Sequence, residues 1–189
     1  PYSTLLVNKS INNIKARNIF GKVIHKTLEG SSPDLKVLEI SIEEKATGEI
    51  MAGAGVGTDG TSFMGAVAEN NWLGRGIKLD SALNISEETV KGSLAVTNPN
   101  FNYSGNAVSA SLDVSSTDLT TSSGYESSKT GFEFGTRFEQ YEDVYFTPGL
   151  DLSFDDLKVD SSASANLKKQ EGSYFDTLFS YNSLKTLKL

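Results

Sequence analysis

The sequence predicts a mainly β protein, in which part of a transmembrane antiparallel β-barrel follows a small α+β unit. Beyond residue 48, apolar and polar side chains alternate with the period of a β-strand. The 17 Gly and 4 Pro suit a many-stranded sheet, and the lack of Cys excludes disulfides and thiolate metal sites. No apolar run reaches the ~20 residues of a membrane-spanning helix, but a barrel strand needs only ~9–11. Strands are therefore the expected means of crossing a membrane.

The N-terminal part of the chain predicts one helix and one hairpin. Ser3 suits the N-cap of a helix over residues 4–17, whose apolar side chains recur on a single face. Two strands, 22–28 and 35–43, follow around a turn at residues 30–33. The second strand alternates apolar with polar residues, so we expect the helix to cover its apolar face.

The rest of the chain predicts about eight strands arranged as a meander. Each has one face of apolar side chains and an opposite face of polar or small ones. The expected strands are 49–57, 62–70, 77–86, 90–97, 108–115, 132–138, 144–154 and 175–181. Isolated charges on the polar face suit a water-filled barrel lumen better than the dry core of a sandwich.

The connections between these strands favour a barrel of the outer-membrane type. The two longest expected loops, residues 116–129 and 155–173, are polar and lie at the same end of the meander. Outer-membrane barrels have short periplasmic turns and longer extracellular loops. We therefore expect both loops to be extracellular and the N-terminal unit to be periplasmic.

The chain offers little that resembles catalytic chemistry. Residues 55–60 fit G-x-G-x-x-G with Asp80 about 20 residues on, so a soluble dinucleotide-binding protein is kept as a less favoured alternative. The single His25 has no nucleophile-elbow motif beside it. The acidic residues around Asp155 lack the spacing of an EF-hand. We expect no enzyme activity, no catalytic residue, no cofactor and no metal site.

Aromatic residues cluster in the second half of the chain. They could form a ligand-stacking site, but their positions at strand ends and on one face favour a lipid wall with an interfacial girdle. These residues are Phe132, Phe134, Tyr141, Tyr145 and Phe146. The net charge of −7 gives no basic face, so we expect no nucleic-acid partner.

Five segments in order resemble motifs of BamA-type outer-membrane assembly factors, in which periplasmic POTRA domains precede an insertase barrel. They are residues 18–23, 43–48, 53–57, 70–76 and 96–101. The second resembles a V-E-E-x-P-T-G junction with Ala46 in place of Pro, the fourth a D-N-x-L-G-x-G turn and the fifth a T-x-P-x-F turn. The resemblance covers nearly the whole chain up to residue 182.

This resemblance implies two domains and a function. Residues 1–48 would be the C-terminal part of the last POTRA domain, in the periplasm. Residues 49–189 would be the N-terminal half of a barrel of about sixteen strands in the outer membrane of a Gram-negative-type bacterium. The implied function is membrane assembly, the folding and insertion of other β-barrel proteins. The implied partners are nascent outer-membrane proteins, outer-membrane lipids and accessory lipoproteins. A related POTRA-barrel polypeptide translocator is the main alternative.

Two sets of residues are the candidate functional sites. The first is the edge strand of a gate, where glycines on one face weaken the strand and let a barrel seam open for a substrate strand. Its residues are Ile50, Ala52, Gly53, Ala54, Gly55, Val56 and Gly57. The residues expected in periplasmic turns are Asn71, Trp72, Leu73, Gly74, Gly76, Asn98, Pro99 and Phe101. An alternative for the glycines is that they only relieve crowding.

Overall fold

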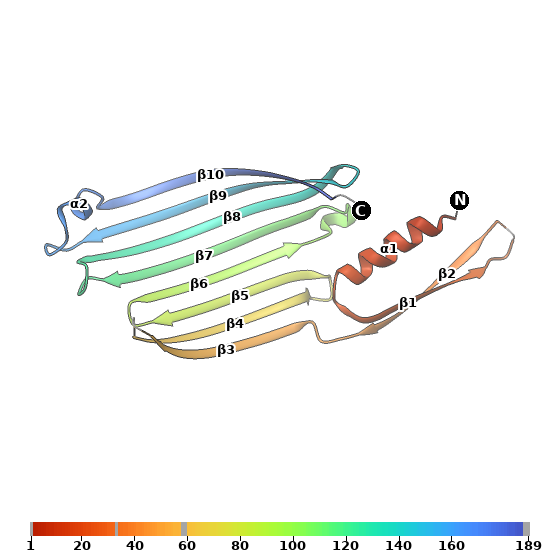
Figure 1. Ribbon diagram of the computed structural model, residues 1–189, viewed down its shortest axis with the longest axis horizontal. Coiled ribbons are helices and arrows are strands. Elements are labelled where there is room, and N and C mark those ends of the chain that lie inside the picture. The colour runs from red at the N-terminus through yellow and green to blue at the C-terminus, as the bar shows by residue number, and fades with distance from the viewer. Residues whose placement is uncertain (1, 33, 58–59, 187–189) are drawn as a thin grey trace.

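A computed structural model describes residues 2–32, 34–57 and 60–186 of the chain (Figure 1). A helix and a two-stranded sheet precede one eight-stranded antiparallel sheet, in which every strand pairs with its neighbours in the chain. The elements are α1 (Thr4–Ala16), β1 (Phe20–Glu29), β2 (Lys36–Glu44), β3 (Gly48–Gly57), β4 (Gly60–Trp72), β5 (Ile77–Ser86), β6 (Thr89–Asn98), η1 (Phe101–Tyr103), β7 (Ala107–Leu119), β8 (Tyr125–Tyr141), β9 (Val144–Val159), α2 (Ala165–Lys168) and β10 (Gly172–Lys185). The predicted mainly β fold and eight-stranded meander are confirmed.

The N-terminal unit packs around one face of α1. The Ser3 hydroxyl accepts a hydrogen bond from the Leu6 amide at 3.4 Å, and Asn18 takes a left-handed φ of 54° just after the helix. Ile11 on the helix is only 2% exposed and Ile19 before β1 only 7%. These two side chains join the helix to the hairpin, and β3 begins directly after the short linker that follows β2.

The strand register brings the apolar faces of all eight strands to one side of the sheet. Directly paired residues point to the same face of an antiparallel sheet. One row of such pairs runs across the sheet through Ile50, Val67, Ser81, Leu94, Leu112, Phe132, Leu152 and Thr177. The neighbouring row on the opposite face carries Met51, Ala66, Ala82, Ser93, Asp113, Gly131, Ser153 and Asp176. The sheet therefore has an apolar outer face and a polar inner face.

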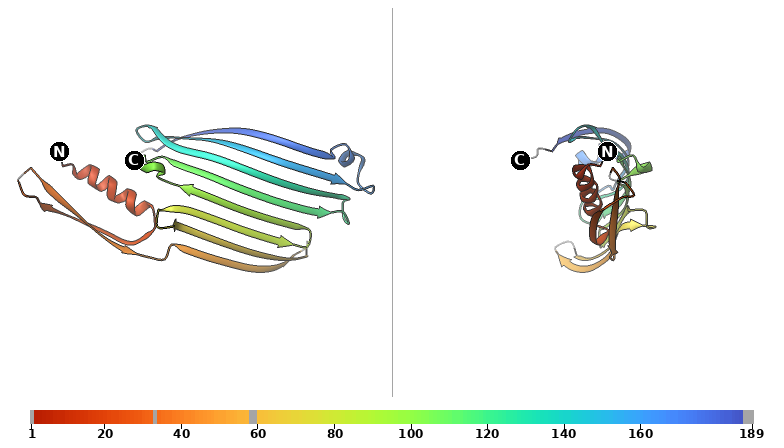
Figure 2. Two further views of the ribbon diagram at one scale, coloured as in Figure 1. Left: turned by 180° about the vertical axis from the view of Figure 1, so that it is seen from behind. Right: turned by 90° about the vertical axis from the view of Figure 1, so that its right-hand side faces the viewer.

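The sheet is an open arc. Viewed along the length of the molecule, the strands curve between two free edges, β3 and β10 (Figure 2, right). The hollows in its surface are lined mainly by residues of the polar face, so that face is the concave one. The barrel is thus present only as an unclosed part, and the assignment of α1, β1 and β2 to a POTRA domain stays a prediction.

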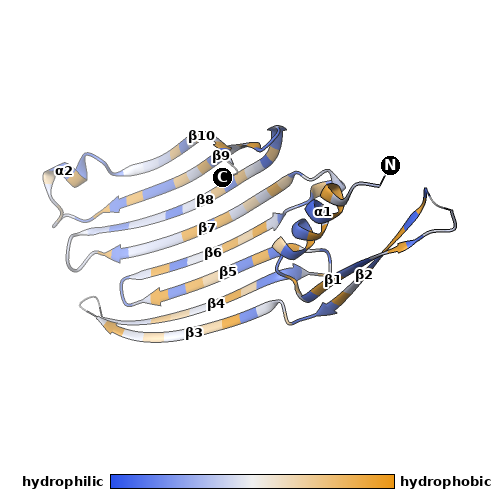
Figure 3. Ribbon diagram, turned by 45° about the vertical axis from the view of Figure 1, so that its right-hand side comes forward, coloured by the Kyte–Doolittle hydropathy of each residue, from blue (hydrophilic) through white to orange (hydrophobic). Residues whose placement is uncertain are grey.

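The apolar outer face is uncovered by the rest of the described chain. Leu94 is 43% exposed, Phe134 49% and Phe179 78%. Figure 3 shows orange segments repeated along the strands rather than gathered in an enclosed core. A continuous apolar surface across eight strands far exceeds the patches of soluble monomers, which indicates that another apolar phase or partner covers it.

The predicted long loops are wrong over much of their length. Strand β7 continues to Leu119 and β8 begins at Tyr125, which leaves only residues 120–124 between them. Strand β9 likewise continues to Val159, and residues 160–171, including α2, lead to β10. Polar side chains stand on both faces of these strand ends, for example where Ser116 pairs with Ser128 and where Asp155 precedes Asp156, so the sequence shows no clear alternation there.

Loop length therefore does not distinguish the two ends of the sheet in the way the sequence predicts. The connection of residues 99–106, at the opposite end of the sheet, is longer than the connection of residues 120–124. The asymmetry between the two ends lies instead in the strands: β7 to β10 extend past the ends of β3 to β6, and their extensions are hydrophilic (Figures 1 and 3). These extensions stand beyond the apolar band.

Candidate functional site

Strand β3 forms one free edge of the sheet. It pairs with β4 on one side, and among the described residues nothing pairs with its other side. All of its residues are exposed, with Ile50 at 84% and Val56 at 86%. A free edge presents unpaired N–H and C=O groups to which another strand can add.

The two faces of β3 differ sharply in side-chain size. Ile50, Ala52, Ala54 and Val56 lie on the apolar outer face of the sheet, and Gly53, Gly55 and Gly57 lie on the polar inner face. On that inner face Gly53 pairs with Met64, Gly55 with Ser62 and Gly57 with Gly60. Cross-strand side-chain contacts are therefore nearly absent on the inner face of the β3–β4 hairpin from Gly53 to its turn.

Nothing in the described chain requires glycine at these three positions. A Cβ added to Gly53 would lie 3.7 Å from Met64 Cε, and one added to Gly55 would lie 3.5 Å from Ser62 Oγ, which are ordinary contacts. A Cβ on Gly57 would meet open space. None of the three has a left-handed φ. The alternative that these glycines relieve crowding has no support within this part of the protein.

The beginning of β3 is attached more firmly than its end. The Thr47 carbonyl just before the strand accepts hydrogen bonds from the Asn70 backbone N–H at 3.1 Å and from Asn70 Nδ2 at 3.2 Å. A Cβ on Gly48 would lie 2.8 Å from Glu69 Oε2, so the strands approach closely there. Side chains of β4, those of Asn70 and Glu69, thus hold the beginning of β3. Farther along the strand, the backbone hydrogen bonds to β4 hold it.

The turn after β4 is built by asparagine and glycine. Asn71 Oδ1 accepts a hydrogen bond from the Gly76 N–H at 2.7 Å, and the Asn71 carbonyl accepts one from the Gly74 N–H at 2.9 Å. Leu73, Gly74 and Gly76 have φ values of 57°, 69° and 64°. The left-handed backbone explains both glycines in this turn.

The same turn contacts the N-terminal unit, a feature that the sequence analysis missed. Gly76 is buried, and a Cβ there would lie 2.8 Å from Arg17 Nη1 and 3.8 Å from Ile19 Cδ1. Gly76 is the only sequence signal for this contact. Because the turn alone also requires a glycine at that position, the signal does not reveal the contact. The turn therefore joins the helix–hairpin unit to the large sheet.

The connection after β6 is also closed by asparagines. Asn98 Oδ1 accepts from the Asn100 N–H at 3.0 Å, and Asn100 Oδ1 accepts from the Gly105 N–H at 2.8 Å. Pro99 lies between these two asparagines, and Phe101, which follows them, is 53% exposed. Both turns lie at the end of the sheet that faces α1 (Figure 1).

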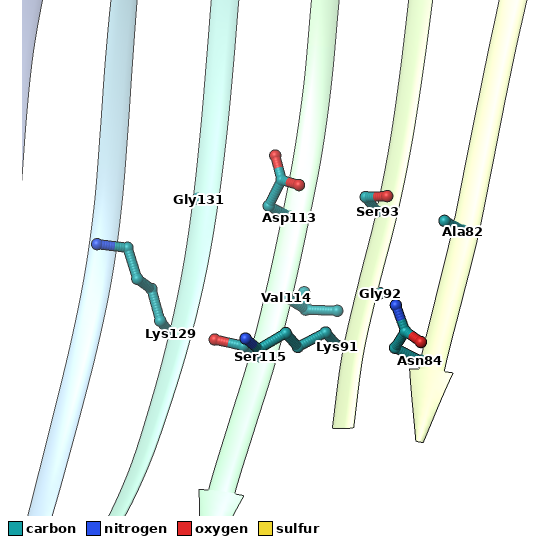
Figure 4. Close-up of a pocket in the computed structure, with 10 residues that line it drawn as sticks. All are labelled: Ala82, Asn84, Lys91, Gly92, Ser93, Asp113, Val114, Ser115, Lys129 and Gly131. Atoms are coloured by element: carbon teal, nitrogen blue, oxygen red, sulfur yellow. The ribbon is translucent and has the colours of Figure 1, made fainter. Parts of the chain in front are cut away.

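The polar face carries mixed charges rather than a catalytic arrangement. A hollow of about 290 Å³ lies between Lys91 on β6, Asp113 on β7 and Lys129 on β8 (Figure 4). Lys129 Nζ lies 3.3 Å from Asp155 Oδ2 on β9. No group of acidic and His side chains suited to a metal occurs in the described part of the chain.

The alternative chemical motifs find no site in the fold. The G-x-G-x-x-G segment runs from the last residues of β3 to the first residue of β4, so a strand follows it where a dinucleotide site needs a helix. Its positions 58 and 59 lie outside the described residues. His25 stands within β1 opposite Ile40. A soluble dinucleotide-binding fold is therefore wrong.

The acidic cluster is divided among separate places. Asp155 and Asp156 are adjacent in β9 and point to opposite faces, where Asp156 Oδ1 accepts a hydrogen bond from Ser173 at 2.6 Å. Asp160 lies in the following connection, where hydrogen bonds from the Ser162 backbone and from Ser161 lower the pKa of its carboxyl. These bonds order the connection and assemble no ligand site.

The prediction that Tyr145 lies on the apolar face is wrong. Tyr145 pairs with Glu139 and lies on the polar face, where the Arg137 guanidinium stands 4.5 Å from the centroid of its ring. Phe132, Phe134 and Phe146 lie on the apolar face as predicted. Strict alternation already separates Tyr145 from Val144 and Phe146 on either side of it, so grouping all five aromatics on one face neglected the period of the strand.

Comparison with known proteins supplies the family context. A family profile described as the Omp85 superfamily domain matches residues 71–186. A crystal structure of BamA from Haemophilus ducreyi lacking POTRA domains 1–3 is similar, with a TM-score of 0.66 and 20% sequence identity. The similarity covers 94% of this chain and 36% of that one, so the chain spans about a third of the solved structure. No helix in the described residues is long and apolar enough to cross a membrane.

Proposed function

Because the chain belongs to the Omp85 superfamily, whose members are non-enzymatic insertases and transporters of the outer membrane, we propose that it helps to fold and insert β-barrel proteins there. In this proposal residues 49–189 are the first half of the barrel, and residues 1–48 are the periplasmic end of a POTRA domain. Its partners are nascent outer-membrane proteins, membrane lipids and accessory lipoproteins. The turns at residues 71–76 and 98–101 face the periplasm.

The observation that carries the proposal is the combination of an apolar convex face with a glycine-lined edge strand. The apolar face supports a position in lipid, since an exposed apolar surface of this size is unfavourable in water. On the inner face of β3, Gly53, Gly55 and Gly57 offer a neighbouring strand almost no side-chain contact, so the backbone ladder and the small outer-face side chains are what hold it. Such a seam opens at lower cost than others and offers its free edge as a template for a substrate strand.

A polypeptide translocator of the same superfamily is the second candidate. It would share the apolar face and the polar, mixed-charge concave face, which could line a passage for an extended chain. A translocator has no need for its seam to open. The weak edge at β3 is the feature that favours insertion over translocation.

A reversible lock on the seam tests the proposal. In the intact protein, Gly55→Cys would be combined with a Cys in the strand that closes the barrel, and assembly of another outer-membrane protein would be measured in proteoliposomes. The matched control is Glu133→Cys with Asp151→Cys, a directly paired couple on the inner face of β8 and β9. These 189 residues contain no Cys that would compete.

The two locks should differ. Oxidation of the seam pair should stop assembly and reductant should restore it, whereas the Glu133–Asp151 lock should leave assembly unchanged. Normal assembly with a fully oxidised seam would contradict the gate and favour the translocator.

A further inference from the structure

Two bulges interrupt the regular register of the large sheet, both next to turns at the end that faces α1. In β4, Glu69 pairs with Leu79 but Trp72 pairs with Ile77, so β4 uses one more residue than β5 over this step. In β8 the register also shifts after Glu139, and Tyr141 pairs with Val144. A bulge of one residue re-aims the side chains that follow it.

Each bulge turns an aromatic side chain from the inner to the outer face. Val67 and Glu69 lie on the outer face, so simple alternation would place Trp72 on the inner one. Because Trp72 instead pairs with Ile77, which has an outward side chain, it lies on the outer face. The effect is the same at the second bulge: Glu139 faces inward, and Tyr141 two residues later pairs with outward-facing Val144.

The two re-aimed residues stand where the apolar outer face ends. Trp72 is the last residue of β4 and Tyr141 the last residue of β8, each followed directly by a turn. Tyr181 lies on the outer face near the same end, with its ring 5.5 Å from that of Phe146. In β4, β8 and β10 the outer face thus changes from aliphatic and Phe side chains to Trp and Tyr side chains just before the chain turns back.

The chemistry of these side chains fits a boundary between apolar and polar surroundings. Trp72 is 40% exposed and Tyr141 67%. Among the described residues, no partner bonds to the Trp72 indole N–H or to the Tyr141 hydroxyl. Each ring has an apolar body and one polar atom, and such side chains concentrate where acyl chains meet headgroups.

We propose that the bulges in β4 and β8 set Trp72 and Tyr141 as anchors at the headgroup boundary of the periplasmic leaflet. This inference rests on the membrane placement in the proposed function. The anchors fix the height of the sheet in the bilayer at the end that carries the N-terminal unit. The bulges serve this role because regular alternation would have turned both rings into the lumen.

Depth-dependent fluorescence quenching tests the anchors in the intact protein. Trp72→Cys and Tyr141→Cys would each carry an environment-sensitive fluorophore in vesicles of phosphatidylcholine brominated either close to the headgroup or close to the acyl end. Leu94→Cys is the control on the middle of the outer face, and Ser111→Cys is the control on the inner face. Any native Cys elsewhere in the protein would first be replaced by Ser.

We expect probes at 72 and 141 to lose most emission to bromine close to the headgroup and little to bromine at the acyl end. Position 94 should show the reverse order, and position 111 should be quenched only by aqueous iodide. Quenching of 72 and 141 by iodide alone, with position 94 quenched by lipid, would overturn the anchors and leave the proposed function standing. No lipid quenching at position 94 would instead overturn the membrane placement.

Removing a bulge gives a second, independent test. Insertion of one Ser between Val144 and Tyr145 gives Gln140 a partner in β9 and restores regular alternation in β8, so a probe at Tyr141 should turn to the inner face, lose its quenching by lipid and gain quenching by iodide. The probe at Trp72 in the same variant is the matched control and should not change. Unchanged lipid quenching at Tyr141 would show that the bulge does not aim the ring, and the proposal would fail.

Discussion

Two hairpins of the large sheet, β3–β4 at one edge and β8–β9 near the other, have the same backbone ladder but very different side chains. Along the inner face of β3 and β4, glycines stand opposite Met64 and Ser62. In β8 and β9, Phe134 stands opposite Leu150, and Lys129 forms an ion pair with Asp155. Cross-strand side-chain pairs add stability to a sheet beyond that of its backbone hydrogen bonds. One antiparallel sheet can therefore contain strongly and weakly held strands without any change of fold.

The free edges of the sheet repeat this difference. Strand β10 is joined to β9 by ring contacts, with centroids 4.7 Å apart for Phe154 and Phe175 and 5.5 Å apart for Phe146 and Tyr181. Strand β3 has no aromatic residue at all. Of the two edges, β3 is therefore the one suited to exchange its partner.

The largest expected effect tests the outer face that both hairpins share. Leu94→Arg in the intact protein should destabilise it by about 2–4 kcal/mol, because a charge near the bilayer midplane is costly. Ser93→Arg, which points to the inner face, should cost much less. Urea titration of the folded protein in lipid vesicles would measure both variants. An equal loss of stability in Leu94→Arg and Ser93→Arg would show that the sheet has no common outer face in lipid.

The next effect should come from strengthening the weak hairpin. Gly53→Val with Gly55→Val should stabilise β3 by about 0.2–1 kcal/mol for each valine, through β-propensity and new cross-strand contacts. The assembly of other outer-membrane proteins should slow while the variant itself still folds. Substituting Val for Gly131 in β8 is the matched control outside the seam. A normal assembly rate in the double variant would mean that the glycines have no part in opening.

The contact between β9 and β10 should weaken measurably when an aromatic pair is removed. Phe154→Ala should cost about 0.5–1.5 kcal/mol from the lost contact with Phe175, in addition to its lost packing. Urea titration in vesicles should show this loss, and the assembly rate should stay normal because the pair lies away from β3. A slowed assembly with unchanged stability would reverse the roles assigned to the two ends.

The smallest expected effect concerns the ion pair on the inner face. Lys129→Met should cost about 0.2–1 kcal/mol, since both side chains of the Lys129–Asp155 pair reach solvent. High salt should reduce the difference between the variant and the natural protein. A loss of several kcal/mol would indicate a drier lumen than the concave polar face implies.

Much of this architecture could be read from the sequence because large apolar residues alternate where strands cross the apolar band. Strand β5 has the bounds predicted for it, Ile77 to Ser86. The prediction failed where alternation stops, since both faces of β7 are polar beyond Val114 and the ladder there shows only in the structure. The hydropathy pattern could not reveal the bulges either. A single added residue near Trp72 or Tyr141 changes the face of the sheet to which the side chain points, but it does not change the composition of the strand.

The candidate site divides in the same way. The alternate glycines of β3 are visible in the sequence, but their open surroundings, such as the empty space beside Gly57, require coordinates. The contact between Arg17 and Gly76 joins segments far apart in the chain, and no local pattern encodes it.

Hydrogen exchange of backbone amides in the intact, membrane-embedded protein measures how easily the seam at β3 opens. The amides of β3 and of the strand that closes the barrel on it should exchange much faster than those of β8 and β9, because fewer side-chain contacts oppose opening there. Peptides from the apolar part of β8 and β9 provide the internal standard at the same depth. Faster exchange at β3 is the predicted result, and protection of β3 equal to or greater than that of β8 and β9 would contradict a weak seam.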